Sequence, residues 1–170
     1  PINIHFIFNP DIISSIESRF FSKINFRYSS TTFSASHSEL IRLGKTIDST
    51  LEDSAAYKKG IEQFVPSFDK IQEVFLNDRE LRDNTIIFVS NSSTDGVSGA
   101  VNHSDYLDGF QGDSQLKAFR QSIYKFVDGI FSATPSDIKY FLGKKSNCSV
   151  EAVVKECGSL KPCVHGSDAH

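Results

Sequence analysis

The run TIIFVS, residues 85–90, limits the possible folds of this chain more than any other segment. It is a continuous apolar run, which is typical of a strand covered on both faces within a parallel sheet. Predicted strands and helices alternate after it. They are a helix over 116–126, a strand over 129–133, helices over 134–143 and 149–157, and a last strand over 161–165. This alternation predicts an α/β fold with right-handed crossovers, built as a parallel sheet or barrel.

Local signals support several of these boundaries. Thr134 and Asp137 have the spacing of a capping-box-like helix start, and Gly143 is placed to end that helix. Ser149 is expected to cap the next helix, and Gly158 to end it.

The segment before residue 85 is predicted to be an insertion. INIHFIF, residues 2–8, has the composition of a first strand, and Asn9-Pro10 suits the N-cap and first position of a helix. Helical spacing of apolar residues follows over 12–24, 40–51, 57–64 and 68–81, and the Ser/Thr-rich segment 29–38 is expected to be a loop or an N-terminal cap region. We therefore expect one α/β domain over 1–170, with a mainly helical insertion over 9–84.

Composition excludes some classes of protein. The net charge is −3, which is not the basic balance typical of a nucleic-acid-binding face. No window approaches about eighteen apolar residues and no signal peptide is visible, so we expect no membrane span and a cytoplasmic location. Cys148, Cys157 and Cys163 are odd in number and match no usual zinc spacing, which favours small buried apolar residues in a reducing cytosol. The chain begins with Pro1 and contains no Met, so we expect an incomplete piece of a longer protein.

Candidate chemistry lies after the strands, because α/β proteins gather functional groups at the carboxyl ends of their strands. The last strand leads into His165, Asp168 and His170, and a long polar segment after residue 90 contains His103. A carboxylate and an imidazole two residues apart can bind one ion, and Gly166 permits a tight turn between strand and ligands. These four residues are therefore candidate metal ligands. The alternatives are a solvated tail for Asp168 and His170 and an exposed loop histidine for His103.

The ending GSDAH, residues 166–170, resembles the closing motif of the PHP (polymerase and histidinol phosphatase) superfamily. The order DGVSGA, a helix, DGIFSATPSDIKYFLGKKS and KPCVHGSDAH is similar to PHP domains fused to AAA-type ATPases of DNA repair or phage defence. The resemblance covers about residues 85–170. It implies a distorted barrel of parallel strands that binds two or three divalent ions and hydrolyses phosphate esters. It also implies that Asp168 and His170 bind metal, with His165 positioned to orient a ligand.

The expected function is accordingly a metal-dependent phosphoesterase that acts on a phosphate ester, nucleic acid included, together with an ATPase region of the parent protein. Zinc, manganese and iron all suit such ligands. The chain departs from the family in three places. It has neither the opening His-x-His nor the early Glu that bridges metals in the family. VSNSS also follows where the family has a histidine, so that His103 would have to replace that ligand. A catalytically degenerate PHP-like module, with a structural or nucleic-acid-docking role, is therefore an alternative, as is an unrelated α/β domain.

Overall fold

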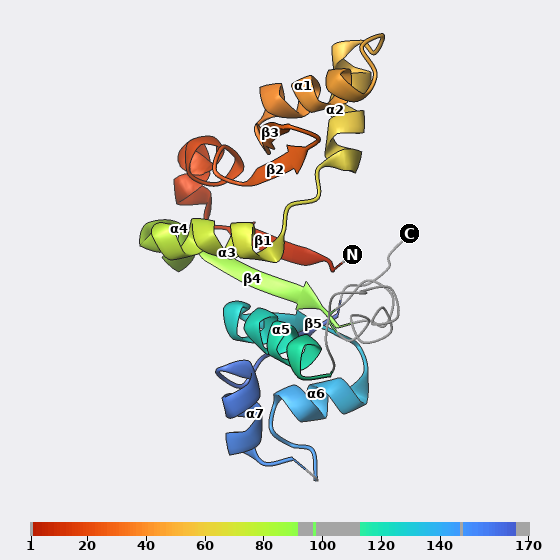
Figure 1. Cartoon of the computed structure of the whole chain (residues 1–170). Helices are drawn as coiled ribbons and strands as arrows, with labels where there is room; N and C mark the ends of the chain where they lie inside the picture. The colour runs from red at the N-terminus through yellow and green to blue at the C-terminus, as the bar shows by residue number, and fades with distance from the viewer. Residues whose placement is uncertain (1, 92–96, 98–112, 147, 166–170) are drawn as a thin grey trace. The chain divides into compact units, whose positions relative to one another are not determined.

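The computed structural model describes residues 2–91, 97, 113–146 and 148–165 (Figure 1). These residues have a mixed α/β structure, and the chain divides into two compact units. The first consists of residues 1–7 and 86–170, and the second of residues 8–85. The boundaries of the second unit lie next to the ends of the predicted insertion.

The first unit is organised on a four-stranded sheet with the order β1-β4-β5-β6. Its strands are β1 (Ile4–Phe8), β4 (Thr85–Ser90), β5 (Gly129–Phe131) and β6 (Cys163–Val164). β4 is parallel to β5, and β5 is parallel to β6. The described strands form an open sheet and not a closed barrel.

β1 runs antiparallel to β4, in contrast to the purely parallel sheet expected. The amide of Ser90 donates to the carbonyl of Asn3 (3.1 Å), and the amide of Asn9 donates to the carbonyl of Asn84 (2.8 Å). The start of β1 therefore lies beside the end of β4. The physical reason is that the chain leaves β1 and enters β4 at the same end of the two strands.

The prediction that β4 is covered on both faces is wrong for the described residues. Ile87 and Val89 are 0% exposed, whereas Ile86, which points to the other face, is 52% exposed. The face of β4 that carries Ile87 and Val89 forms one hydrophobic core with three helices. They are α5 (Asp113–Phe126), α6 (Pro135–Phe141) and α7 (Val150–Cys157). Residues of this core include Ile87, Val89, Leu116, Ile123, Val127, Ile130, Phe141, Val153 and Cys157.

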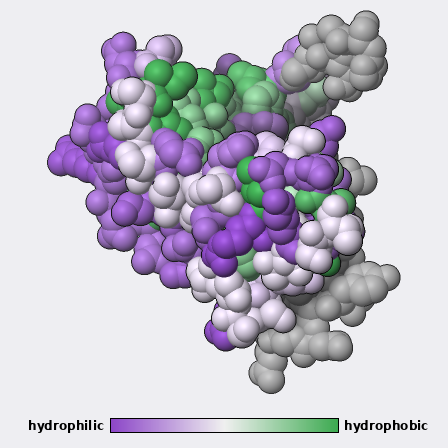
Figure 2. Space-filling model, turned by 90° about the horizontal axis from the view of Figure 1, so that it is seen from above, coloured by the Kyte–Doolittle hydropathy of each residue, from purple (hydrophilic) through white to green (hydrophobic). Residues whose placement is uncertain are grey.

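The opposite face of the sheet carries exposed side chains. Ile7, like Ile86, is 52% exposed, and His5 packs its ring edge-on against Phe131 with 4.7 Å between centroids. Phe88 also contacts Phe131, at 5.1 Å. The face drawn in Figure 2 is mostly hydrophilic, with hydrophobic residues at its surface in a few places. The sheet face that carries Ile7 and Ile86 is therefore the open side of the first unit.

The predicted helix boundaries in the first unit are largely confirmed. Ser149 caps α7, since its side chain accepts a hydrogen bond from the Ala152 amide (3.2 Å). Gly143 (φ 66°) and Gly158 (φ 81°) follow α6 and α7 in the left-handed region that favours glycine.

The second unit contains helices and a hairpin. A 3₁₀ turn over Pro10–Ser15 and a π-helical turn over Glu17–Phe21 replace the α-helix expected there, although Asn9 caps the first turn as predicted. The helices α1 (His37–Ile47), α2 (Asp53–Gln63), α3 (Phe68–Asn77) and α4 (Arg79–Asp83) follow β2 (Asn25–Tyr28) and β3 (Thr31–Ser34). The single helix predicted over 68–81 is interrupted at Asp78, which has extended backbone (φ −135°).

The Ser/Thr-rich segment 29–38 is predicted to be a loop or an N-terminal cap region. The cap is confirmed at its end, where Ser36 is the N-cap of α1, but a loop is wrong for its first part, which belongs to an antiparallel hairpin. β2 and β3 pair with Phe26 opposite Phe33, and Phe33 is 1% exposed. Ser29 occupies the turn with φ 54°. The burial of Phe33 outweighs the loop character of its polar neighbours.

α1 and α2 approach each other very closely at two glycines. A Cβ atom placed on Gly44 would lie 1.9 Å from the carbonyl oxygen of Ala56. A Cβ atom on Gly60 would lie 2.0 Å from the carbonyl oxygen of Leu40. Each of these glycines thus faces the backbone of the partner helix, and Leu43 beside them is 0% exposed. The pair is held by backbone-to-backbone packing, which only glycine permits.

An ion pair joins the π-helical turn to the start of α4. Arg19 Nε donates to Asp78 Oδ2 (2.7 Å), and Asp78 Oδ1 also accepts from the Leu81 amide (2.9 Å) as the N-cap of α4. The hydrogen bond from Arg19, together with that from Leu81, holds the pKa of the Asp78 carboxyl below its usual range. Arg19 also pairs with Glu80 (2.8 Å).

Asp78 gives the second unit a defined acid sensitivity. Its native pKa lies below the unfolded value of about 3.9, so its stabilising effect is complete above that pH and is lost as pH falls through the native pKa. We expect Asp78→Asn, which keeps an N-cap oxygen, to be less stable than wild type at pH 7 and to lose less stability on acidification. Urea unfolding between about pH 7 and pH 2 measures both effects. Glu80→Gln is the matched control, and equal acid sensitivity of Asp78→Asn and wild type would contradict the assignment.

Candidate functional site

The carboxyl ends of β4, β5 and β6 bring three polar residues to one edge of the sheet. Asn91 follows β4, and its amide donates to the carbonyl of Phe131 (3.0 Å). Ser132 follows β5, and its amide donates to the carbonyl of Val164 (2.9 Å). His165 follows β6 and is exposed. In parallel sheets this edge is the usual place for ligands.

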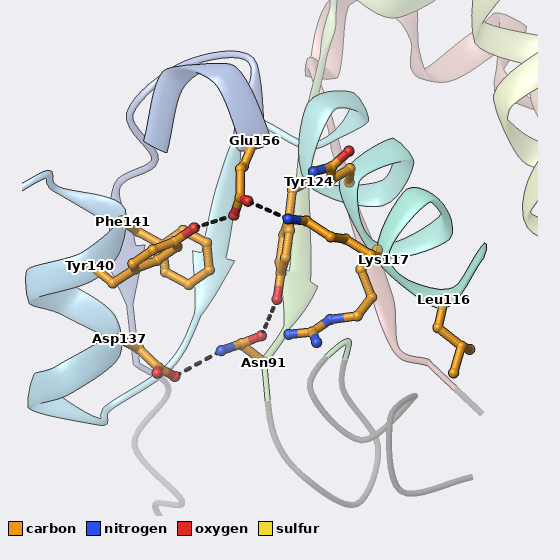
Figure 3. Close-up of a pocket in the computed structure, with 10 residues that line it drawn as sticks. Asn91, Leu116, Lys117, Tyr124, Asp137, Tyr140, Phe141 and Glu156 are labelled. Atoms are coloured by element: carbon orange, nitrogen blue, oxygen red, sulfur yellow. Dashed lines mark hydrogen bonds and ion pairs between the residues drawn. The ribbon is translucent and has the colours of Figure 1, made fainter. Parts of the chain in front are cut away.

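A chain of hydrogen bonds connects this edge with the helices. The Tyr124 hydroxyl on α5 donates to Asn91 Oδ1 (2.6 Å), and Asn91 Nδ2 donates to Asp137 Oδ2 on α6 (2.8 Å). The Ser132 hydroxyl donates to the same carboxylate oxygen (2.7 Å). Figure 3 shows Asn91 between Tyr124 and Asp137. This edge network, Asn91, Tyr124, Ser132 and Asp137, fixes the end of β4 relative to α5 and α6.

The edge network borders a cleft of about 620 Å³ between α5, α6 and α7 (Figure 3). Leu116 and Phe141 contribute apolar surface to its lining, and the remaining lining residues bear polar groups. The lining is therefore mixed: a small apolar area with convergent hydrogen-bonding groups, which is the usual character of a small-molecule site.

An ion pair spans α5 and α7 in this cleft. Lys117 Nζ lies 3.2 Å from Glu156 Oε1, and the Tyr140 hydroxyl donates to Glu156 Oε2 (2.8 Å). The bond from Tyr140, followed by that from Lys117, lowers the pKa of Glu156. Burial, followed by the Glu156 carboxylate, raises the pKa of Tyr140 well above its usual value. At neutral pH Glu156 is thus a carboxylate and Tyr140 a phenol, and they hold each other in place.

Arg120 is the cation of the cleft that has no carboxylate partner among the described residues. Its Nε is buried and has no hydrogen-bond partner in the described part of the chain. Its guanidinium is a hydrogen-bond partner of the Tyr124 hydroxyl and thereby lowers the pKa of Tyr124, but burial, the larger effect, raises that pKa overall. Glu156 is influenced by the charge of Arg120 through space alone.

The residues predicted to bind metal are only partly described. His165 has the predicted place after the last strand, whereas His103, Asp168 and His170 lie outside the described residues. Within 2–91, 97, 113–146 and 148–165, no three His, Cys, Asp or Glu side chains come together in a way that could hold a metal ion. The described residues therefore supply one predicted ligand, His165.

The prediction of buried cysteines is confirmed for Cys157, whereas Cys148 and Cys163 are only half-buried. Cys157 is buried, and this burial raises the pKa of its thiol to about 11. At neutral pH it is a protonated, unreactive core side chain. Cys163, on β6, also has a raised pKa because of burial.

Sequence reasoning did not find the edge network. It assigned Asp137 to a capping box with Thr134, but the Thr134 amide donates to the Ser132 hydroxyl (3.2 Å) and the Asp137 carboxylate accepts from Ser132 and Asn91. The available signal was positional, since Asn91 and Ser132 are the first residues after two parallel strands. The capping pattern already explained why an aspartate stands at position 137, so its hydrogen bonds with Asn91 and Ser132 were not predicted.

Comparison of the chain with protein-family models, with curated proteins and with solved structures found no significant match. The function is therefore argued from the residues of the chain itself. No helix in the described residues has both the length and the apolar character needed to cross a bilayer.

Proposed function

We propose that the chain is a metal-dependent phosphoesterase domain of the PHP type, which acts with an ATPase region of the parent protein in the cytoplasm. One observation carries the proposal. β6 is parallel to β5 and leads, through His165 at the ligand-binding edge of the sheet, directly into the Gly-Ser-Asp-Ala-His motif of residues 166–170. The free cysteines support a reducing compartment.

The architecture of the first unit is compatible with a part of a β/α barrel. Its helices share a core with one face of the sheet, and the opposite face carries the exposed Ile7, Ile86 and His5. In a barrel of this kind the helices lie outside and the strand side chains of the other face fill the interior. The parallel strands β4, β5 and β6 would belong to the barrel wall.

In this proposal Asp168 and His170 are metal ligands, His103 completes the ligand set, and His165 orients a ligand by a hydrogen bond. Bound zinc, manganese or iron supplies an activated water and stabilises the charge on the phosphate. Asn91 and Ser132 hold the neighbouring strand ends in place through the edge network. The substrate is a phosphate ester, in nucleic acid or in a smaller molecule.

Metal content tests the proposal. We expect near-stoichiometric metal in the intact protein by elemental analysis, and at least an about tenfold loss in Asp168→Ala and His170→Ala, because each removes a ligand. Hydrolysis of p-nitrophenyl phosphate and of its bis-ester should fall in parallel. Asp69→Ala, at an exposed carboxylate of α3, is the matched control and should keep its metal. Metal-free wild-type protein, or hydrolysis unaffected by Asp168→Ala, would contradict the proposal.

One observation favours a second candidate, the catalytically degenerate module. Asn91 stands after the strand where the family has a histidine, and both ends of its amide are engaged by Tyr124 and Asp137. An amide whose donor and acceptor are both engaged in this way links β4 to the helices and does not serve as a metal ligand. If this candidate is right, wild type and Asp168→Ala will both lack metal and will have equal melting temperatures, and the unit will serve as a structural or nucleic-acid-docking part.

A further inference from the structure

The cleft between α5, α6 and α7 has the size of a small-molecule site. Its volume of about 620 Å³ lies within the range of about 300–1,000 Å³ found for ligand pockets. Its lining side chains belong to the first unit, and none of them is a predicted metal ligand.

The charges in the cleft leave one cation without a carboxylate. Lys117 is neutralised by Glu156 at 3.2 Å, and the Asp137 carboxylate accepts hydrogen bonds from Asn91 and Ser132. Arg120 makes no ion pair among the described residues, and its buried Nε has no partner there.

A guanidinium stays charged at every physiological pH, and its planar fork of donors matches the oxygens of a phosphate. A buried donor without a partner is unfavourable unless a ligand or water satisfies it. The ligand group that would best pair with the Arg120 guanidinium is therefore an anion with at least two oxygens, such as a phosphate.

The aromatic residues of the cleft offer a second recognition element. Tyr124 and Tyr140 both pack edge-on against Phe141, with centroid separations of 5.2 and 5.1 Å. Both hydroxyls are engaged, that of Tyr124 with Asn91 and that of Tyr140 with Glu156, so the rings are held in position before a ligand arrives. Tyr124 and Phe141 are buried, so the half-buried ring of Tyr140, packed on Phe141, is the aromatic group that a ligand can reach. Nucleic-acid bases stack on such side chains irrespective of their sequence.

We propose that this cleft is a nucleotide-binding site, with the phosphate on Arg120 and the base against the ring of Tyr140. A phosphate alone uses Arg120 but not the aromatic ring, and a nucleoside alone uses the aromatic ring but not Arg120. The ligand class is therefore a nucleoside monophosphate, which uses both elements at once.

Calorimetric titration of the intact protein tests the site. The probes are adenosine 5′-monophosphate, adenosine and inorganic phosphate, each with a chelator present so that a phosphate held by metal does not contribute. We expect the monophosphate to bind at least about tenfold more tightly than either part. Failure of the monophosphate to bind at up to about 10 mM, or equal affinity for adenosine, overturns the proposal.

Variants identify the residue responsible. Arg120→Gln should weaken binding of the monophosphate about tenfold or more and should leave it no tighter than adenosine. Lys125→Gln, an exposed cation on the same helix, is the matched control and should bind as wild type does. An unchanged Kd in a folded Arg120→Gln protein overturns the assignment. Should that variant not fold, chemical-shift changes in the wild-type protein decide, since the monophosphate must perturb Arg120 and Tyr140.

Discussion

Gly44→Ala is expected to lower the free energy of unfolding of residues 8–85 by about 3 kcal/mol, the upper end of what overpacking usually costs. The added methyl group would stand 1.9 Å from the Ala56 carbonyl oxygen, and a backbone atom in a packed helix cannot move aside cheaply. Glycine within an exposed helix shows the opposite behaviour, since replacement by alanine there stabilises by about 0.5–1 kcal/mol. A loss of stability in Gly44→Ala, instead of a gain, would therefore indicate that the backbones of α1 and α2 are in contact.

Two further variants make this experiment specific. Gly60→Ala should behave in the same way, because its methyl group would stand 2.0 Å from the Leu40 carbonyl oxygen. Ser54→Ala, at an exposed position of α2, should change stability by no more than about 0.5 kcal/mol. Urea unfolding followed by circular dichroism measures all three. A Gly44→Ala protein as stable as wild type would show that the helices are not in backbone contact.

Asp137→Ala is expected to destabilise the first unit by about 2–3 kcal/mol, because hydrogen bonds to a charged group are worth about 1.5–3 kcal/mol and one carboxylate oxygen accepts two of them. The loss leaves the Ser132 hydroxyl and the Asn91 amide without their acceptor. Asn91 is also the acceptor for Tyr124, so the position of α5 beside the end of β4 should loosen. Thermal unfolding gives the overall change, and amide hydrogen exchange in β5 and α6 locates it.

Asp137→Asn is the matched control for this network. It keeps one carbonyl oxygen of similar position as an acceptor but removes the charge, so we expect a smaller loss of stability than for Asp137→Ala. Equal effects of the two variants would mean that the volume of the side chain matters and its hydrogen bonds do not. Unchanged exchange in β5 and α6 in Asp137→Ala would contradict the network directly.

The elements of the first unit were predictable because their signals are local. The apolar run of β4, the helical stripe of α5 and the capping residue Ser149 each lie within a few consecutive residues. Gly143 and Gly158 likewise mark helix ends by their own backbone requirement. For these segments the secondary structure that the local sequence favours is the one found in the folded chain, as is usual for natural sequences.

The errors arose where distant pairing decides the structure. The β2–β3 hairpin depends on Phe26 lying opposite Phe33, and the surrounding serines and threonines made the segment resemble a loop. The direction of β1 depends on where the chain returns after the second unit, which no local pattern encodes. Asp78, where the predicted helix is interrupted, also pairs with Arg19, 59 residues away in the sequence.

The candidate site shows the same division. The ending GSDAH was recognisable from five consecutive residues, and the roles of His103, Asp168 and His170 remain predictions outside the described residues. The edge network joins Asn91 to Tyr124 and Asp137 across 33 and 46 residues, so it has no period or spacing that a sequence reader could follow. Arg120 looked like an ordinary cation on a helix, and only the surroundings of its side chain distinguish it.

The pairing of β1 with β4 has a consequence for how the protein is made. Asn9 and Asn84 meet through a backbone bond of 2.8 Å and a side-chain bond of 2.9 Å, although 75 residues separate them. At about 5–20 residues per second, β1 leaves the ribosome roughly 4–15 s before its partner strand exists. The second unit, residues 8–85, is complete only when β4 begins to emerge. The nascent chain must therefore keep β1 in solution without its partner strand throughout the synthesis of the second unit, which is the stage at which a chaperone would be of most use.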